Sequence, residues 1–158
     1  MIREFEFYHG AVLGRLIRGS EGLSLEQYPG FGRNAAYVIN KRVGLYIKHS
    51  TNRLTPWSFT FKQEHQDEIH EMRSVLEQVF VALVCWEDGV VCLSYDELKV
   101  ILDENHNTSE WIRVARRTRE KYTVSGSDGK LRYKIGENEF PEKILEHLVR
   151  ASDLTLLA

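Results

Sequence analysis

The sequence predicts an α+β fold, in which a mixed central sheet is flanked by helices and followed by a C-terminal β-hairpin and helix. Apolar residues recur every three to four positions in residues 4–18, as in a helix with one buried face. Two β-rich runs meet at a polar turn within residues 35–50. The continuous apolar run at residues 79–84 is typical of a strand covered on both faces. These three patterns together indicate helices packed against a central sheet.

Length and composition favour one compact domain over residues 1–158. Hydrophobic residues make up 42% of the chain and charged residues 28%, as in ordinary globular proteins. No apolar run approaches the roughly 18 residues that a membrane span requires. The N-terminus is acidic and aromatic, unlike a secretory signal. We therefore expect a cytoplasmic protein without a membrane segment.

Local patterns divide the first half of the chain into further elements. Strands are predicted at residues 23–28, on both sides of the turn in 35–50, and at 57–61. Thr60 and Gln63 have the spacing of a capping box, which predicts a helix at residues 62–78. The outer face of that helix is acidic and is interpreted as solvated surface; it carries Glu64, Asp67, Glu68, Glu71 and Glu77.

In the second half of the chain, the sequence predicts a strand and a short helix, followed by three strands and a final helix. A turn at Asp88-Gly89 leads to a strand at 90–93, and the capping box of Ser94 and Glu97 predicts a helix ending near Leu102. Residues 103–109 are predicted as a loop. The remaining predicted elements are strands at 111–117, 121–126 and 130–135 and a helix at 141–150.

The two cysteines, Cys85 and Cys92, flank the predicted turn at Asp88-Gly89. Pairing outward from that turn sets them directly opposite each other, so a disulfide is geometrically conceivable. In a reducing cytosol we expect two thiols that behave as small hydrophobic side chains. Without a nearby histidine pair they do not form a zinc site.

Lys48 stands at the end of the second strand of the central hairpin, before two small hydroxyl residues. A turn at residues 41–42 would place Tyr37 across from Tyr46 and on the same face as Lys48. Asn40 and Asn34 are the nearby polar side chains. His49 should point to the opposite face of its strand, and His65 and His70 are five residues apart on different helix faces, so each is expected to be an ordinary hydrogen-bonded or surface histidine.

The order of elements in residues 5–84 is helix, three strands, an extra strand, helix and strand. Without the extra strand it resembles the αβββαβ core of the PD-(D/E)XK nuclease superfamily, which has a restriction-endonuclease-like fold. In that family carboxylates hold a divalent metal and a lysine helps to activate water against a phosphodiester. Residues 45–51 look like the lysine-bearing third strand of the family, and the resemblance implies that Lys48 is the catalytic lysine.

The chain departs from the family pattern at its carboxylates. Tyr46 occupies the acidic position two residues before Lys48, and tyrosine does not replace a carboxylate as a ligand of a hard metal at neutral pH. Tyr37 and Asn40 lie where the second acid would be sought. The resemblance therefore implies a candidate set of Lys48, Tyr46, Tyr37 and Asn40 without a complete metal site, no cofactor, and Mg²⁺ only if the protein is catalytically active.

Basic residues concentrate near the C-terminus. Residues 113–134 carry a net charge of +6, which leaves −8 for the rest of the chain. Lys130, Arg132 and Lys134 alternate along one predicted strand face, opposite a core face of Tyr122, Val124, Leu131, Tyr133 and Ile135. Such a row suits phosphate contacts. The predicted nucleic-acid contacts are Arg53, Arg113, Arg116, Arg117, Arg119, Lys130, Arg132 and Lys134.

Three functional hypotheses follow from these observations. The first is a nucleic-acid-binding or nucleic-acid-processing protein, for DNA or RNA, with a restriction-endonuclease-like core and an incomplete catalytic site. The alternative is a non-enzymatic interaction or homo-oligomerising accessory protein whose acidic helix meets a basic sheet face. The third is a metal-dependent nuclease that uses Asn40, Glu6 or an acid from elsewhere in the chain.

Overall fold

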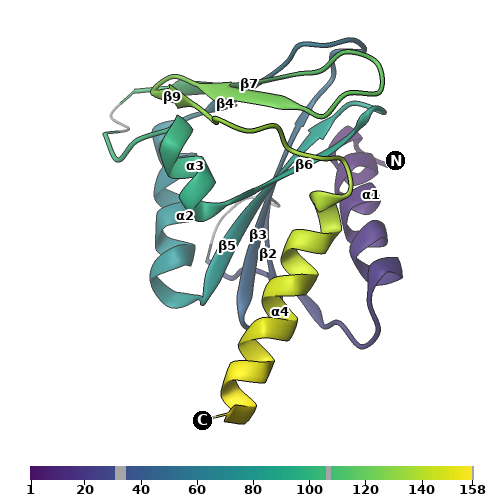
Figure 1. The fold of residues 1–158 in the computed structure, drawn as a ribbon, viewed down its shortest axis with the longest axis vertical. Coiled ribbons are helices and arrows are strands. Elements are labelled where there is room, and N and C mark those ends of the chain that lie inside the picture. Colours follow the sequence, from purple (N-terminus) through teal and green to yellow (C-terminus); the bar gives the residue numbers. More distant parts are fainter. Residues whose placement is uncertain (31–34, 106–107, 158) are drawn as a thin grey trace.

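The fold is mixed α+β, as the sequence predicts (Figure 1). The computed structural model describes the backbone of residues 1–30, 35–105 and 108–157, and side chains as far as Arg150; Asn34 lies outside the described residues. Within that part of the chain there are four helices, a five-stranded mixed sheet and a four-stranded antiparallel sheet. None of its helices has the length and apolar character that a membrane crossing would need.

The first sheet is built mainly from the N-terminal half of the chain. Its strands, in spatial order, are β1 (Leu25–Gln27), β2 (Ala36–Ile39), β3 (Val43–Ser50), β5 (Gln78–Cys85) and β6 (Gly89–Ser94). The second sheet has the order β4 (Trp57–Phe61), β7 (Glu110–Ala115), β8 (Thr123–Gly126) and β9 (Gly129–Lys130). The helices are α1 (Glu4–Gly19), α2 (Gln63–Val75), α3 (Tyr95–Ile101) and α4 (Glu139–Leu157). Only β3 and β5 pair in parallel among the described strands.

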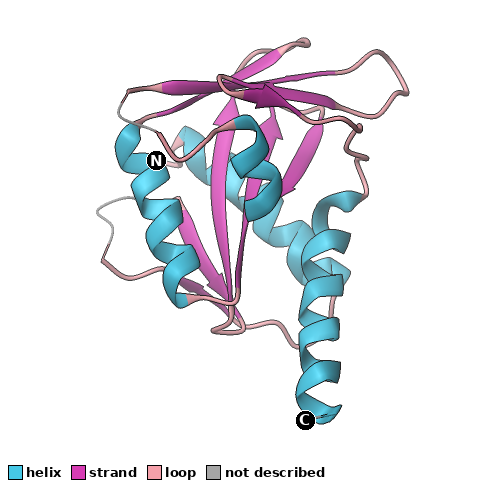
Figure 2. Ribbon diagram, turned by 60° about the vertical axis from the view of Figure 1, so that its left-hand side comes forward, coloured by secondary structure: helices cyan, strands magenta, loops and turns pink. Residues whose placement is uncertain are grey.

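Helices cover both faces of the first sheet (Figures 1 and 2). One face packs against α1 and α4, with Val12, Leu45 and Ile144 in that core. The other face packs against α2, α3 and the inner face of the second sheet, with Met72 and Phe59 among the buried residues. Because β3 and β5 are enclosed on both sides, residues 43–47 of β3 and residues 79–85 of β5 are all buried. The buried strand predicted at residues 79–84 is confirmed.

Strand β4 follows β3 in sequence but belongs to the second sheet. Its odd-numbered residues Trp57, Phe59 and Phe61 are buried, whereas Ser58 and Thr60 are exposed. This alternation is typical of a sheet with one core face and one solvent face. The extra strand of the predicted order therefore leads the chain out of the central sheet and forms the edge of an open outer surface.

The expected pairing of the two cysteines is wrong. The connection between β5 and β6 has three residues instead of two, with Trp86 in a left-handed conformation (φ 48°), so Cys85 pairs with Gly89 and Cys92 pairs with Ala82. The register differs by three residues, and an odd shift moves one cysteine to the opposite sheet face. Both thiols are free and buried, as small hydrophobic side chains would be. Burial raises the pKa of Cys92 to about 12.

Several predicted boundaries shift where tertiary pairing takes over. Helix α2 begins after Lys62 instead of Thr60, and it ends at Val75 because β5 starts at Gln78 to pair with β3. The predicted strand at 130–135 is ordered as a strand only at its start, in β9. Beyond it the chain turns away, and Tyr133 is 56% exposed and donates a hydrogen bond to Glu97 (2.7 Å) instead of entering the core. The capping box of Ser94 and Glu97 is confirmed.

Gly126 provides a test of how closely α3 packs on the second sheet. A Cβ atom at this position would overlap the backbone carbonyl of Ile101 at the end of α3. We expect Gly126→Ala to lower the free energy of unfolding by about 1–3 kcal/mol, since the backbone must move to accommodate it. Urea denaturation would measure the change.

Gly10 is the matched control for this substitution. It lies within α1, and no atom is within 4 Å of the position of an added Cβ. Gly10→Ala should raise stability by up to about 1 kcal/mol, because alanine is the better helix former. Equal effects of the two substitutions would contradict the close packing of α3 against β8.

Candidate functional site

Lys48 lies where the two sheets and α2 meet. Its ammonium donates a hydrogen bond to the backbone carbonyl of Thr60 in β4 and lies 3.2 Å from Nδ1 of His65 in α2. It also sits 4.9 Å from the ring centroid of Phe61. Nδ1 of His65 accepts the backbone N–H of Lys62 as well (3.1 Å), so it acts as an acceptor and the ring proton is assigned to Nε2. Lys48 therefore joins the first sheet to β4 and α2.

Tyr46 brings a carboxylate into this group indirectly. It lies on the same face of β3 as Lys48, and its hydroxyl donates to Oε2 of Glu68 (2.8 Å). Glu68 is half-buried on α2, the helix whose acidic face the sequence indicates as solvated. At the position where the resemblance requires a metal-binding acid, the structure has a tyrosine hydrogen-bonded to a glutamate.

Tyr37 does not share a face with Lys48, contrary to the sequence prediction. The β2–β3 turn occupies residues 40–42 instead of 41–42, so Tyr37 pairs with Leu45, and Ala36 pairs with Tyr46. A shift of one residue moves the side chain to the other face. There the hydroxyl of Tyr37 lies 2.8 Å from Nδ1 of the buried His9 in α1.

Asn40 also lies away from Lys48. It is in the left-handed region (φ 53°) at the start of the turn, which asparagine tolerates well. Its Oδ1 accepts the N–H of Ser24 and its own N–H donates to the carbonyl of Ser24, both at 2.9 Å. Five strand residues separate this end of β3 from Lys48, about 16 Å of extended chain. Asn40 therefore fixes the hairpin and is not part of the Lys48 group.

The surface around Lys48 is concave and mixes polar with apolar side chains. Two adjoining hollows of about 370 and 590 Å³ share Lys48, His49 and His65 in their walls. The first also contacts Tyr46 and His9, and the second is lined by residues of β4 and of the loop before it, among them Ser50, Thr51, Asn52, Ser58 and Thr60. The Lys48 group is thus accessible from solvent.

His49 points to the opposite face from Lys48, as predicted. Its ring stacks on Tyr8 of α1 (centroids 4.3 Å apart, interplanar angle 7°), and its Nε2 lies 3.5 Å from a Glu4 carboxylate oxygen. Burial lowers the pKa of His49, although the nearby Glu4 opposes that shift. His9 is only 6% exposed, and burial together with His49 lowers its pKa to about 4. Aromatic and imidazole rings therefore fill the space between β3 and α1.

The outer face of the second sheet forms a separate polar surface. Direct cross-strand partners form one row across its four strands, in the order Ser58, Arg113, Ser125 and Lys130. Trp111 pairs with Thr60 in a neighbouring row and is 48% exposed. An exposed indole thus lies on the same sheet face as two cations and several hydroxyl groups.

A basic hollow of about 520 Å³ adjoins this face. Apart from Arg116, its cationic walls are Arg113, Arg117, Lys121 and Lys134, and the hydroxyl-bearing Thr55 and Thr123 also contact it. Glu120 is the acidic member and lies 3.4 Å from the Lys134 ammonium, a pair that is about half exposed. We use the term basic face for this surface, which consists of Arg113, Arg117, Lys121, Lys134, Lys130 and Trp111.

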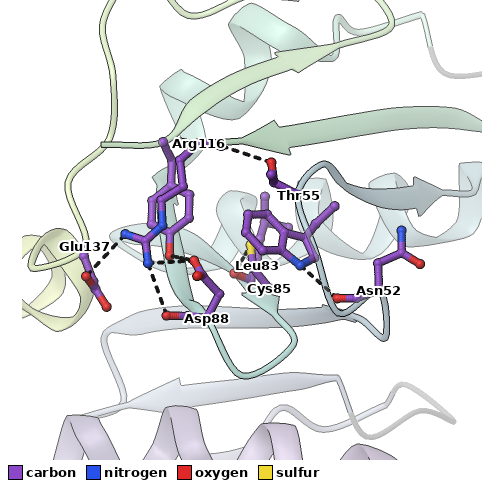
Figure 3. A network of polar contacts seen from close by, with 9 residues as sticks. Asn52, Thr55, Leu83, Cys85, Asp88, Arg116 and Glu137 are labelled. Carbon is purple, nitrogen blue, oxygen red and sulfur yellow. Dashed lines mark hydrogen bonds and ion pairs between the residues drawn. The ribbon is translucent and has the colours of Figure 1, made fainter. Parts of the chain in front are cut away.

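Arg116, a predicted nucleic-acid contact, is instead part of a structural network (Figure 3). Its guanidinium lies 2.7 Å from Oδ2 of Asp88 and 3.4 Å from Glu137, and it covers the ring of Tyr122 at 4.4 Å. The hydroxyl of Tyr122 donates to the same Asp88 oxygen (2.7 Å). Only 15% of the Arg116 side chain is exposed. Burial and the bond to Asp88 raise the pKa of Tyr122.

The other predicted cations are exposed in loops. Arg53 lies in the β3–β4 loop with its guanidinium 5.7 Å from the ring centroid of Trp86. Arg119 is in the left-handed region (φ 68°) after β7, and Arg132 follows β9. Because the strand predicted at 130–135 ends at Lys130, the row of Lys130, Arg132 and Lys134 is not formed on one strand.

Metal ligands do not gather around Lys48. In residues 1–30, 35–105 and 108–157, one set of three carboxylates could hold a metal ion, and it consists of Asp103, Glu110 and Asp128. The partners of Lys48 and Tyr46 are not in this set. Comparison of the chain with protein families, with curated proteins and with solved structures finds no match.

Sequence reasoning missed His65 and Glu68 as members of the Lys48 group. They are three residues apart, which puts them on one face of α2. That spacing was visible in the sequence, but the approach of α2 to the end of β3 depends on the route of β4. Trp111 lies on the outer face of β7 because Ile112 and Val114, on the other side of the strand, are buried.

The buried His9 predicts a pH dependence of stability. Its folded pKa of about 4 lies below the usual 6.5, so the unfolded chain takes up a proton first as the pH falls. This histidine should therefore cost stability progressively between pH 6.5 and pH 4, by up to about 3 kcal/mol. His9→Gln should flatten the fall over this window in urea denaturation, and an unchanged slope in this variant would contradict the role of His9.

Alanine substitutions at Arg116 and Arg117 should distinguish a cation that stabilises the fold from one that is available for binding. We expect Arg116→Ala to lower the free energy of unfolding by about 2–4 kcal/mol, because Asp88 and Tyr122 lose a shared partner in a partly buried network. Arg117→Ala, at an exposed neighbouring position, should change it by less than about 0.5 kcal/mol. Similar losses from both substitutions would contradict the structural role of Arg116.

Proposed function

We propose that the protein binds nucleic acid, DNA or RNA, through the basic face of its second sheet. The observation that carries this proposal is the basic hollow, in which Arg113, Arg117, Lys121 and Lys134 surround a space of about 520 Å³. Cations that converge on a concave surface favour a partner with regularly spaced negative charges, and the phosphate backbone is such a partner.

The neighbouring residues fit the other groups of a nucleic acid. Hydroxyl side chains such as Thr55 and Thr123 can donate hydrogen bonds to phosphate oxygens. The exposed ring of Trp111 offers a platform on which an unpaired base can stack. Both kinds of contact tolerate any sequence, so we infer binding with little base specificity and a preference for single-stranded segments.

The Lys48 group enters the proposal as an incomplete nuclease site. The resemblance to the restriction-endonuclease-like core rests on element order, and the parallel pairing of β3 with β5 through α2 is compatible with it. Hydrolysis by that family requires carboxylates on a divalent metal beside the lysine. Here the Tyr46 hydroxyl is hydrogen-bonded to Glu68, and the Lys48 ammonium is hydrogen-bonded to the Thr60 carbonyl and to His65. We therefore infer binding without cleavage, in the cytoplasm, where the two free thiols suit a reducing environment.

Fluorescence anisotropy at two salt concentrations tests the binding proposal. Labelled single-stranded DNA, duplex DNA and single-stranded RNA would be titrated with the full chain at 50 and 200 mM salt. Removal of one cation that binds a phosphate should reduce the slope of log K against log salt by about 0.7–0.9. The double substitution Arg113→Ala with Arg117→Ala should therefore weaken binding at 50 mM salt and reduce the slope by about 1.5.

Two further variants sharpen the result. Trp111→Ala should weaken binding of single strands roughly 5- to 150-fold, the range expected for one stacked base, with a smaller effect on duplexes. Arg150→Ala removes an exposed cation on α4 and should leave binding unchanged. Absence of binding at 50 mM salt would refute the proposal, and salt-sensitive self-association in its place would support the protein-interaction alternative. Plasmid cleavage with Mg²⁺ or Mn²⁺ that Lys48→Ala abolishes would refute the non-catalytic part.

A further inference from the structure

Three carboxylates converge at one end of the second sheet, beside the end of α3. Asp103 follows α3, Glu110 is the first residue of β7, and Asp128 lies in the β8–β9 turn. One carboxylate oxygen from each lies within 4.8 Å of the others. In the part of the chain that the structure describes, no lysine, arginine or histidine forms an ion pair with any of them. Three like charges at this distance repel one another unless a cation or a proton intervenes.

Lys99 does not neutralise the cluster. Lys99 on α3 feels the charges of Glu104, Glu110 and Asp103, but its ammonium lies over the ring of Tyr95, 5.3 Å from the centroid. Burial lowers the pKa of Lys99 more than these acids raise it. Among the described residues, the three carboxylates therefore lack the cation that an acidic cluster in a folded protein ordinarily has.

Backbone hydrogen bonds hold the two aspartates in place. The N–H of Asp103 donates to Oδ2 of Asp128 (2.9 Å), and the N–H of Asn105 donates to Oδ1 of Asp103 (2.9 Å). The N–H of Asp128 donates in turn to the carbonyl of Ile101 at the end of α3 (3.0 Å). The convergence is thus built into the joining of α3 with the β8–β9 turn.

Buried polar atoms without partners provide a second, independent observation. Glu110 is 7% exposed, and its Oε2 has no hydrogen-bond partner within the described structure. Gln66 on α2 is 2% exposed, and neither amide atom of its side chain makes a hydrogen bond of normal geometry there, although the side chain lies close enough to Glu110 to lower its pKa. An unpartnered buried polar group costs about 1–3 kcal/mol. Such groups on two different elements at one point indicate a missing ligand.

We propose that Asp103, Glu110 and Asp128 bind a hard divalent cation such as Ca²⁺ or Mg²⁺. All three side chains offer oxygen, the ligand that Ca²⁺, Mg²⁺ and Mn²⁺ prefer. One oxygen from each side chain lies within 4.8 Å of the others, which is close enough for all three to contact one ion. Asp103 and Asp128 are exposed, which leaves room for water as further ligands.

Proton binding and cation binding compete at this site. Burial and the neighbouring Asp128 and Asp103 raise the pKa of Glu110. A bound cation requires the carboxylate form, so acid should weaken cation binding. The cation also joins the end of α3, the start of β7 and the β8–β9 turn, so occupancy stabilises the second sheet.

Calorimetric titration and thermal unfolding of the full chain test this site. CaCl₂ and MgCl₂ would be titrated separately into protein first treated with a chelator. At a Ca²⁺ concentration about 100 times the dissociation constant, Tm should rise on the order of 5 °C. Asp128→Asn preserves the acceptor for the Asp103 N–H and should weaken Ca²⁺ binding at least roughly 10-fold. Glu71→Gln, which neutralises an exposed acid on α2, should leave affinity and the Tm shift unchanged.

The variant Glu110→Gln distinguishes loss of cation binding from loss of folding. Neutralising this buried carboxyl relieves the repulsion among the three acids, so the variant should unfold at the same or a higher temperature than the chelated wild type, yet show no rise in Tm with Ca²⁺. Binding of either cation that Asp128→Asn and Glu110→Gln both abolish supports the site, and the stronger of the two titrations identifies the ion. Absence of binding at millimolar Ca²⁺ and Mg²⁺, or an equal Tm shift in wild type and both variants, overturns it.

Discussion

The parallel pairing of β3 with β5 is the constraint on which the other features depend. Both strands are buried on both faces over most of their length, so their backbone groups must bond within the sheet and their side chains there are mainly apolar. A parallel pair needs a crossover, and α2 supplies it on the face opposite α1. Because the crossover also includes β4, the same connection lifts one strand out of the first sheet. The position of Lys48 beside Thr60 and His65 follows directly from that route.

Much of this architecture could be predicted from local pattern. Element types and order were correct because helical and strand periods are properties of neighbouring residues, as in α1 and at residues 79–84. Register was not. The turns after Ile39 and Cys85 each contain three residues, and Asn40 and Trp86 adopt positive φ in them. An odd change of register, by one residue at the first turn and by three at the second, moves a side chain to the other face, and this placed Tyr37 and Cys92 wrongly.

The sites depend still more on contacts between distant segments. The charge asymmetry that indicated an anionic partner was visible in composition, yet Arg116 belongs to Asp88 and Tyr122, which lie on other elements. His65 and Glu68 meet β3 only because α2 packs on it. Nothing in the local sequence distinguishes Glu110 from other residues at the start of a strand. Only the folded structure places Asp103 and Asp128 beside it. The residue types in the sequence suggested which chemistry was available. The contacts made in the folded structure determine which of these residues can take part in it.

The second sheet is assembled from segments that are far apart in the chain. Trp57 of β4 pairs with Val114 of β7, and the intervening residues form α2, two strands of the first sheet and α3. Closing so long a loop is entropically costly and slow. During synthesis the backbone groups of β4 must therefore remain without their strand partner until β7 has been made. A chain that stops at α3 would keep the strands of the first sheet but present Trp57, Phe59 and Phe61 on an unpaired edge, a surface prone to aggregation.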